Sequence, residues 1–396
     1  LCKEHEITVF EAGNHVGGHT HTHDIVHNAK HYAIDTGFIV FNETTYPNFC
    51  KILDRLGLQS QPTEMTFSVR CSRTNIEYSA HTLNTFFSQR KNFFVPSHYR
   101  MIFDIFRFRK QFAALLDHKN DSEPLVPFLE KNGYSDKFIH LFILPITASL
   151  WSASPDKAKN FPLGTFVRFF ENHGFLDILN PFEWKVIKGG SSTYVDKMTP
   201  LFKDKIRLSC QVLSIKRHSD HVSIMHKEGS DDFDHVILAV HSDQALNILA
   251  DATDLEKKIL GSICYQKNNI LLHTDTAILP SKKATWASWN YYIPRKEHKA
   301  ASLSYDMNIL QGITSPDEFL VSLNQQELIK PNKIIGKYIY HHPVFSPEVP
   351  AAQKRHAAIS GVNRTHFCGA YWGYGFHEDG VKSSLAVCKF FGKKLL

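Results

Sequence analysis

The sequence lacks several features that would assign it to a specialised class of protein. Its seven cysteines are scattered and odd in number, and none belongs to a CxxC pair. This argues against a disulfide framework and structural zinc, and a reducing cytosol fits such cysteine usage best. No apolar run reaches the length of a membrane span, and no arginine-rich run or RNA-binding signature accompanies the net charge of +6. We therefore expect neither a membrane-spanning protein nor one that binds nucleic acid.

What is present is the composition of a globular enzyme. A chain of 396 residues can bury a large core, and its length suggests two or three domains. The hydrophobic fraction of 43% and the charged fraction of 21% are ordinary for such a protein. Thirty phenylalanines are more than average, and they indicate a large apolar pocket or surface.

The stretch at 6–20 carries the clearest functional signal. A short apolar run at 7–10 is typical of a buried strand, and this strand ends in the carboxylate of Glu11. An acid at the end of the second strand of a dinucleotide-binding unit accepts hydrogen bonds from the adenosine ribose hydroxyls. The pair Gly17 and Gly18 then lets the backbone approach a flat or phosphorylated ligand, because no Cβ intervenes.

The glycine-rich phosphate turn that accompanies such an acid lies roughly 20 residues before it. With the acid at position 11, that turn would fall before residue 1. The chain has no initiator Met, and residues 1–5 look like the last turn of a helix. We therefore expect the sequence to start partway into its first βαβ unit.

The strand, Glu11 and the glycine pair resemble the second strand and double-glycine motif of the flavin-containing amine oxidase superfamily. This superfamily includes protoporphyrinogen oxidases and carotenoid desaturases. Most members have Arg after the glycine pair, whereas this chain has His19. The His variant resembles a bacterial branch of predicted FAD-dependent oxidoreductases that are often encoded beside fatty-acid cyclopropanation enzymes. The resemblance implies a noncovalent FAD contacted by Glu11, Gly17, Gly18 and His19.

Two internal segments extend the resemblance. The segment at 32–41 resembles the family's D-x-G segment, which runs along the isoalloxazine ring. There, Gly37 would permit close backbone approach and Phe38 would pack near the ring; the alternative is a hairpin turn followed by a buried strand. Val212 stands at the position whose backbone binds adenine in the family.

A strand, a glycine-punctuated loop and a helix follow one another between residues 366 and 391. A helix N-terminus presents unpaired N–H groups, which suit a pyrophosphate or the carbonyl edge of a flavin. This arrangement resembles the last motif of the family. Tyr371 stands near the place where amine oxidases usually carry an acid, so we expect no cofactor contact from its side chain. The cofactor neighbours implied here are Gly369, Asp379, Gly380 and Val381.

The order of elements predicts an α/β fold. We expect an FAD-binding Rossmann-like domain of the glutathione-reductase type, interleaved with an α+β substrate domain that has a helical cap. Five alternating extended runs between 268 and 345 predict an antiparallel sheet in the substrate domain. The expected cofactor-domain segments are 1–78, 181–248 and 346–396, and the expected substrate-domain segments are 79–180 (helical) and 249–345 (sheet).

The segment at 83–112 is both aromatic and basic. A basic, Phe-rich amphipathic helix can lie in a membrane interface. It can equally pack on the substrate domain with its basic edge in water, which is the commoner arrangement. Beside a cytoplasmic location we therefore keep peripheral contact with the inner membrane face as an alternative expectation.

Histidines alternate at positions 19, 21 and 23. Imidazoles can converge on a metal ion, but no carboxylate or cysteine is placed to complete such a site. We predict a strand or loop beside the cofactor here, and no metal site.

A flavin supplies redox chemistry itself, so an enzyme of this kind needs no catalytic triad. The polar groups that could lie near the ring are Tyr374, His377, His341 and His342, and each is more often structural than catalytic. We expect an FAD-dependent oxidoreductase that acts on an apolar substrate, such as a fatty acyl chain. Amine oxidation is the alternative within the enzyme class. Outside it, the alternatives are a non-catalytic flavoprotein and a peripheral membrane-binding module.

Overall fold

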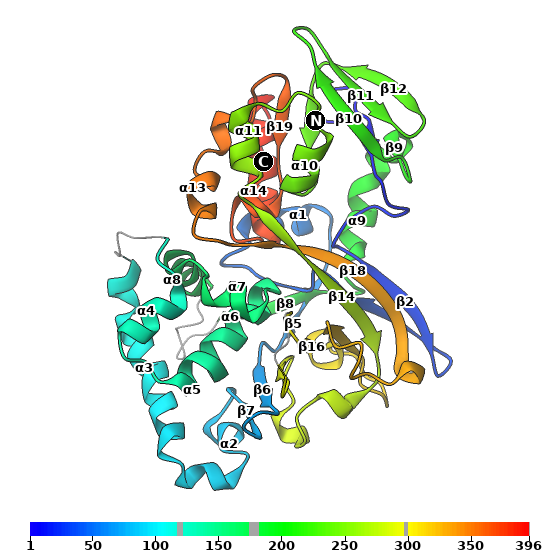
Figure 1. The fold of residues 1–396 in the computed structure, drawn as a ribbon. Coiled ribbons are helices and arrows are strands. Elements are labelled where there is room, and N and C mark those ends of the chain that lie inside the picture. The colour runs from blue at the N-terminus through cyan, green and yellow to red at the C-terminus, as the bar shows by residue number, and fades with distance from the viewer. Residues whose placement is uncertain (117–121, 174–181, 297–299, 396) are drawn as a thin grey trace.

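The computed structural model describes residues 1–116, 122–173, 182–296 and 300–395. Figure 1 shows an upper lobe, which holds both ends of the chain, and a lower lobe built from a large sheet and a group of helices. The predicted boundary at 180/181 lies outside the described residues.

Parallel strand pairs join distant parts of the sequence in the upper lobe. Strand β1 (Val9–Phe10) pairs with β9 (Ile206–Arg207), and β13 (Val236–Leu238) pairs with β19 (Thr365–Phe367). The helices of this lobe are α10 (Ser242–Ile248), α11 (Asp254–Leu260), α13 (Val349–Gln353) and α14 (His377–Phe390). The pairings bring the first and last parts of the chain into one lobe.

A three-stranded meander extends from this lobe. Its antiparallel strands are β10 (Val212–Arg217), β11 (Val222–His226) and β12 (Gly229–Phe233). The alternating pattern from 206 onward predicts that Ile206 and Arg207 belong to the same meander. The structure instead pairs them with β1, because their neighbours in space come from the other end of the sequence.

A seven-stranded sheet dominates the lower lobe. Its order is β18-β14-β17-β16-β15-β6-β7, and β15–β6 is its parallel pair. The five strands between 264 and 344 match the five predicted runs. Strands β6 and β7, inside the segment expected for the cofactor domain, extend the same sheet. The bounds are β6 (Phe67–Cys71), β7 (Ile76–Ser79), β14 (Cys264–His273), β15 (Trp289–Ile293), β16 (Leu303–Asp306), β17 (Leu320–Leu323) and β18 (Ile334–Val344).

Short elements connect the two lobes. A hairpin of β2 (Thr22–His27) and β3 (Lys30–Asp35) turns at Asn28 and Ala29, both with positive φ. A small sheet has the order β4-β8-β5. The remaining bounds are β4 (Val40–Asn42), β5 (Ser60–Thr63), β8 (Trp184–Ile187), α1 (Pro47–Arg55) and α9 (Ser192–Met198).

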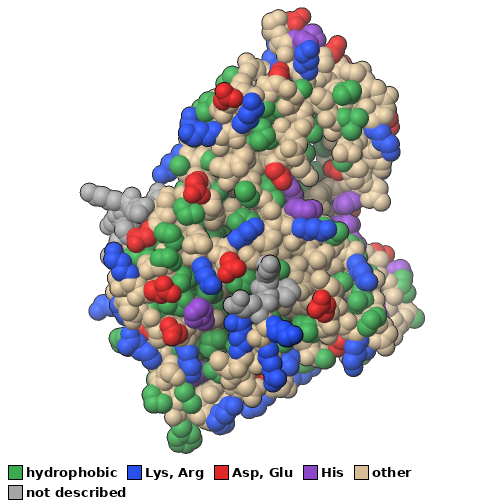
Figure 2. Space-filling model, viewed as in Figure 1, with side chains coloured by type: hydrophobic (Ala, Val, Ile, Leu, Met, Phe, Trp, Pro, Cys, Tyr) green, Lys and Arg blue, Asp and Glu red, His purple; other side chains and the backbone are tan. Residues whose placement is uncertain are grey.

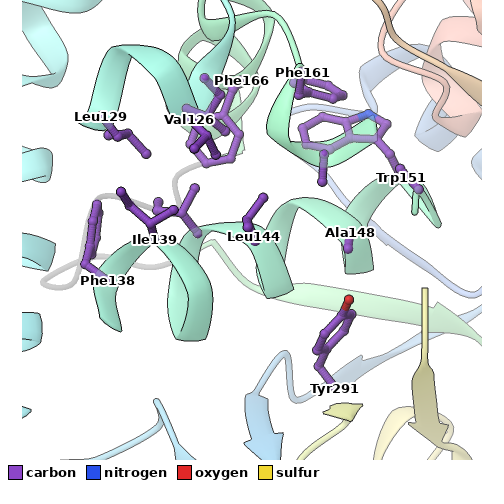
Figure 3. Packing of buried hydrophobic residues seen from close by; sticks show 14 of the residues in the cluster. Val126, Leu129, Phe138, Ile139, Leu144, Ala148, Trp151, Phe161, Phe166 and Tyr291 are labelled. Atoms are coloured by element: carbon purple, nitrogen blue, oxygen red, sulfur yellow. The ribbon is translucent and has the colours of Figure 1, made fainter. Parts of the chain in front are cut away.

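The helical part of the lower lobe covers one side of the sheet (Figure 1). Its elements are α2 (Leu83–Phe86), η1 (Arg90–Phe94), α3 (Pro96–Leu116), α4 (Leu125–Lys131), α5 (Asp136–Phe138), η2 (Ile139–Ile143), α6 (Leu144–Trp151), α7 (Pro155–Lys159) and α8 (Leu163–Asn172). A Phe-rich core fills the space between them, with Phe138, Phe161 and Phe166 at most 1% exposed. Figure 3 shows Leu144 and Ala148 of α6 between this core and Tyr291 of β15.

Pro145 explains the irregular turn before α6. Proline has no N–H to donate to the carbonyl four residues earlier, which is that of Leu141. The hydroxyl of Tyr78 in β7 donates to this carbonyl instead, at 2.6 Å. The π-helical turn η2 therefore coincides with a contact between the helices and the sheet.

Candidate functional site

The glycine pair forms a tight turn after β1. Gly17 has φ +117° and Gly18 has φ +57°, values that favour glycine. A Cβ on Gly17 would lie 2.7 Å from the carbonyl oxygen of Thr20, while the Thr20 N–H donates to the Gly17 carbonyl at 2.9 Å. The geometry of the turn therefore requires glycine at position 17.

Glu11 follows β1, as predicted. One carboxylate oxygen, Oε1, accepts the N–H of Gly13 at 2.7 Å. Within the described part of the chain, Oε2 has no hydrogen-bond partner, and the carboxylate is only partly buried. The side chain is therefore fixed on one side and available to a ligand on the other.

Gly37 makes a close approach, but to the chain's own backbone. A Cβ at this position would lie 2.0 Å from the carbonyl oxygen of His19. The next N–H, that of Phe38, donates to the same carbonyl at 2.9 Å. The 32–41 segment is therefore clamped to the glycine-pair turn. The Phe38 ring stacks on His377, with centroids 3.8 Å apart.

A chain of three side chains links the glycine-pair turn to the closing motif. The Tyr194 hydroxyl lies 2.6 Å from Oγ1 of Thr20 and 2.7 Å from Nε2 of His377. Thr20 comes two residues after the glycine pair, and His377 begins α14. The two ends of the sequence therefore meet here, as the predicted cofactor site requires.

Both acids of the closing motif, Glu378 and Asp379, accept hydrogen bonds from backbone N–H groups. Asp379 Oδ2 accepts the N–H groups of Tyr374 and Phe376, at 3.0 and 3.1 Å. Glu378 accepts the N–H groups of Asn48 and Phe49, so it caps the start of α1. Burial raises the pKa of Asp379 to about 6. These carboxylates hold the loop around α14 in place.

The other predicted neighbours of the closing motif lie around the same helix start. The Gly369 N–H donates to Oγ of Ser383 at 2.9 Å. Gly380 lies in the first turn of α14, where a Cβ would meet only the backbone nitrogen of Ala370, at 3.9 Å. Val381 follows it and packs against the cluster around Phe49.

Asp35 is the hydrogen-bonding centre beneath the glycine-pair turn. Its buried carboxylate accepts Oγ1 of Thr22 at 2.5 Å and both the N–H and Oγ of Ser191. Nε2 of Gln311 donates to its other oxygen at 3.2 Å. Burial raises the pKa of Asp35 to about 6, and these donors limit the rise. Asp35 thus joins β3 to the turn before α9.

Histidines gather where the two lobes face each other. Figure 2 shows them at a notch in the surface between the lobes. The His19 ring lies parallel to that of His342, with centroids 5.5 Å apart, and His241 stacks on Tyr265 at 4.2 Å. His341 lies near His241, at 6.4 Å between centroids.

Three of the histidines around this meeting point, His19, His342 and His377, are neutral at pH 7. Burial lowers the pKa of His19 to about 4, that of His342 to about 3 and that of His377 to about 3. Neighbouring imidazoles add to the shift at His19 and His342. This part of the notch therefore offers polar rings without charge.

Two predicted residues lie further from this meeting point. Val212 begins β10 in the meander, opposite His226. Tyr374 lies in the closing loop, where its carbonyl accepts Nε1 of Trp151 at 2.9 Å and its hydroxyl accepts Nδ2 of Asn172 at 3.3 Å. Tyr374 therefore connects the closing loop to α6 and α8.

Sequence reasoning missed the bridging role of Tyr194 and the centre formed by Asp35. Apart from Thr22, which is 13 residues from Asp35, their partners lie more than 150 residues away in the chain, so no local pattern signals them. The histidines at 19, 21 and 23 also form no metal-binding group in the described residues, where Cys210, His226 and Glu228 are the cluster with suitable ligand atoms.

The parallel strand pairs, the ribose-type acid, the glycine-pair turn and the helix start define a dinucleotide-binding oxidoreductase of the FAD class. The chain belongs to the family described as flavin containing amine oxidoreductase, whose model matches residues 2–303. It is therefore an FAD-dependent enzyme of that family. A comparison with curated proteins found no match.

Solved structures share this fold over nearly the whole chain. Cyclohexylamine oxidase from Brevibacterium oxydans IH-35A is 15% identical with a TM-score of 0.68, covering 99% of this chain and 95% of that one. A CLA-producing fatty acid isomerase from P. acnes is 15% identical with a TM-score of 0.69, covering 97% and 92%. A putative protoporphyrinogen oxidase from Exiguobacterium sp. 255-15 is 14% identical with a TM-score of 0.64, covering 97% and 92%. The predicted α/β FAD-binding fold is confirmed.

The residues present fit an FAD in three respects. Oε2 of Glu11 is available to ribose hydroxyls, and the loop that follows holds a buried Nε2 of His15 without a partner among the described residues. The start of α14 supplies N–H groups beside the glycine-pair turn. Glu11, the glycine-pair turn and α14 would hold the cofactor.

Proposed function

We propose that this enzyme oxidises or desaturates a long apolar substrate, with a fatty acyl chain as the substrate class. The observation that carries the proposal is a cavity of about 340 Å³ between the helices and the sheet of the lower lobe. Its walls include Leu141, Leu144, Tyr291 and Ile293, and Arg73 stands at its edge. Lys159, Asp156 and His140 also line the cavity, so apolar walls with basic groups beside them suit a hydrocarbon chain that ends in an anionic group.

Helix α6 connects this cavity to the closing loop. Leu144 and Pro145 at its start line the cavity, and Trp151 at its end donates to the Tyr374 carbonyl. Eight helical residues span about 12 Å. A long acyl chain covers such a distance, whereas a short alkylamine does not.

The uncharged surroundings of the closing motif also support an apolar reacting group. His342 and His377 are neutral because burial lowers the pKa of each to about 3. The carboxylates of Asp35 and Asp379 already accept several hydrogen bonds from the protein. A substrate ammonium would find no free carboxylate at these positions, and burying an unpaired charge is costly.

The fold gives the cofactor, the cavity-lining residues and the link between the two ends of the chain separate roles in the proposed reaction. Glu11, the glycine-pair turn and α14 would hold FAD, which would supply the two-electron oxidation: forming the double bond would release one hydrogen as a hydride to the flavin and the other as a proton to solvent. The side chains that line the cavity exclude water and align the chain, and Arg73 binds its anionic end. The link through Thr20, Tyr194 and His377 keeps the glycine-pair turn against the closing loop.

Amine oxidation is the second candidate, because cyclohexylamine oxidase and putrescine oxidase share the fold. Anaerobic bleaching of the flavin absorbance separates the two. We expect bleaching by a long-chain acyl substrate, with a raised KM in Arg73→Gln. Bleaching by alkylamines alone would establish the second candidate, and bleaching by neither would overturn both substrate classes.

A further inference from the structure

We propose that the face formed by α2, η1 and the first half of α3 docks on an anionic phospholipid bilayer. This docking face exposes large apolar side chains that a globular protein normally buries. Phe94 is 89% exposed and Leu83 is 71% exposed. The residues of the docking face are Leu83, Phe93, Phe94, Tyr99, Phe103 and Phe106, each at least 44% exposed.

The apolar residues of the docking face form one connected surface. Tyr99, Phe103 and Phe106 follow the i, i+4, i+7 spacing that places side chains on one side of a helix. The Tyr99 hydroxyl donates to the Phe93 carbonyl at 3.0 Å, and the Phe93 ring stacks on Phe87 with centroids 4.4 Å apart. The helix α3 and the segment η1 therefore present their rings together.

The opposite side of α3 is buried in the core. Met101 is 0% exposed and Phe108 is 4% exposed, and both belong to the Phe-rich cluster of the lower lobe. The exposed rings are thus a second apolar side of a helix whose first side is already packed. Folding of the described chain leaves this second side in water.

The segment that carries the docking face is almost entirely positive in its charged residues. Segment 83–112 contains six basic residues and one acid, against a net charge of +6 for the whole chain. That acid, Asp104, is fully buried and accepts Nε of Arg100 and the N–H of Ser135. Phe side chains beside Lys and Arg are the composition of helices that lie in a membrane interface. Each basic residue near an anionic leaflet adds attraction.

The positive charge also selects a bilayer over a second copy of the chain. In a twofold dimer the same surface patch of both subunits would meet, so the basic residues would face one another. Anionic headgroups neutralise them instead.

The docking face lies close to the proposed substrate cavity. Phe86 of α2 packs on the Tyr78 ring, with centroids 4.8 Å apart, and the Tyr78 hydroxyl donates to the carbonyl of Leu141, which lines the cavity. Only β7 separates the two. Delivery of an acyl substrate from the bilayer rests on the proposed function, whereas the docking itself does not.

Vesicle flotation of the full chain tests the docking without turnover. The wild type should bind phosphatidylglycerol-containing vesicles and release them in high salt, with weak binding to pure phosphatidylcholine. Leu83→Glu combined with Phe94→Glu should reduce binding at least about ten-fold. Leu201→Glu is the matched control, because Leu201 is also 71% exposed but lies in η3 (Thr199–Leu201) beside α9.

Equal binding by the wild type, the double variant and the control would overturn the proposal. A wild type that ignores vesicles but forms a dimer, which the double variant abolishes, would show that a second copy covers the face, and would also overturn it. Vesicle binding without acyl turnover would support docking and count only against the proposed substrate.

A second, independent observation concerns the meander. We infer that Cys210, His226 and Glu228 bind a zinc ion. Their ligand atoms all lie within 4.8 Å of one another, and Sγ of Cys210 is 3.4 Å from Nδ1 of His226. With Zn–S at about 2.3 Å, Zn–N at about 2.1 Å and a tetrahedral angle, these two atoms would lie about 3.6 Å apart. The pair needs almost no movement to become ligands.

The His226 ring is already oriented for this role. Its Nε2 lies 3.1 Å from Asp231 Oδ2, the carboxylate contact that typically supports a metal-bound histidine. Nδ1 faces Sγ of Cys210 and accepts the N–H of Glu228 at 3.3 Å, a contact that a bound zinc ion would replace. Arg207 fixes Asp231 in turn, at 2.6 Å. Glu228 is exposed in the tight turn between β11 and β12, so a water molecule can complete four ligands.

Cobalt(II) substitution tests this site, since a thiolate ligand gives Co²⁺ a charge-transfer absorption that histidine alone does not. We expect one equivalent of Co²⁺ to produce the band, Zn²⁺ to displace it, Cys210→Ser to abolish it and Glu228→Gln to weaken binding. Cys264→Ser, at an exposed cysteine, is the control and should leave it unchanged. No band in the wild type, or the same band in Cys210→Ser, would overturn the inference.

Discussion

The hydroxyl of Tyr194 is the contact by which the two ends of the sequence hold each other, and its removal is a direct test of that arrangement. In Tyr194→Phe, the ring keeps its place beside Phe49, but Oγ1 of Thr20 and Nε2 of His377 lose their shared partner. Thr20 is 2% exposed, so water does not readily replace the hydroxyl. A buried polar group left unpaired costs about 1–3 kcal/mol, and for the two groups we expect a loss of about 2–4 kcal/mol in the free energy of unfolding.

Chemical denaturation followed by tryptophan fluorescence measures this loss. Tyr99→Phe is the matched control, because it also removes a hydroxyl that donates one hydrogen bond, but at an exposed position. We expect the control to lie within about 0.5 kcal/mol of the wild type. Equal stability of both variants would refute the bridge.

Two further predictions follow from the same region. Acidification from pH 7 to 6 should lower the free energy of unfolding. In the folded protein His377 stays neutral because its pKa is lowered to about 3, whereas in the unfolded chain the same histidine takes up a proton below about pH 6.5. The free energy of unfolding should therefore fall by up to about 1.4 kcal/mol per pH unit. Asp35 and Asp379, each with its pKa raised to about 6, oppose this in part from about pH 7 downward, because their folded forms hold the proton more tightly. A rise in stability from pH 7 to 6 would contradict the assignment. Gly37→Ala should destabilise far more than Gly18→Ala in denaturant titrations, since the new Cβ would lie 2.0 Å from the carbonyl oxygen of His19, whereas nothing lies within 4 Å at Gly18. Similar losses in both would contradict the clamp.

The sequence carried the elements of the fold because each has a local cause. The apolar run before Glu11 and the five alternating runs of the large sheet appear as strands in the structure. The pairing of Ile206 and Arg207 with β1 could not be predicted in the same way. Strand pairing depends on partners that are distant in the chain. The two candidate partners of Ile206 and Arg207, β1 and the first strand of the meander, are both apolar, so the sequence pattern does not distinguish between them.

The candidate site shows the same division. The local pattern places Glu11 and the glycine pair directly after β1, as the structure has them, and their contact with FAD stays a prediction. Gly37 was expected to allow a close approach of the backbone to the isoalloxazine ring. A close approach exists, and its partner in the structure is the carbonyl oxygen of His19. The acids Glu378 and Asp379 became caps of α1 and of the closing loop because buried carboxylates require donors, which here are backbone N–H groups from elsewhere in the fold.

Whether segment 83–112 contacts a membrane depends on how helix α3 packs, which the sequence pattern does not show. The Phe and Arg residues of 83–112 are equally consistent with a packed helix and an interfacial one. The structure shows that α3 has both an apolar buried side and an apolar exposed side. Among the described residues, no helix is both long and apolar enough to cross a bilayer.

The measurement that tests the central claim most directly is the FAD content and FAD affinity of Glu11→Ala, compared with Glu43→Ala. Glu43 pairs with Lys185 on the surface, at 2.5 Å, and serves as the control. Since a hydrogen bond to a charged group contributes about 1.5–3 kcal/mol, we expect Glu11→Ala to bind FAD about 10- to 100-fold more weakly, and Glu43→Ala to match the wild type. Equal FAD content and affinity in both variants would contradict the account.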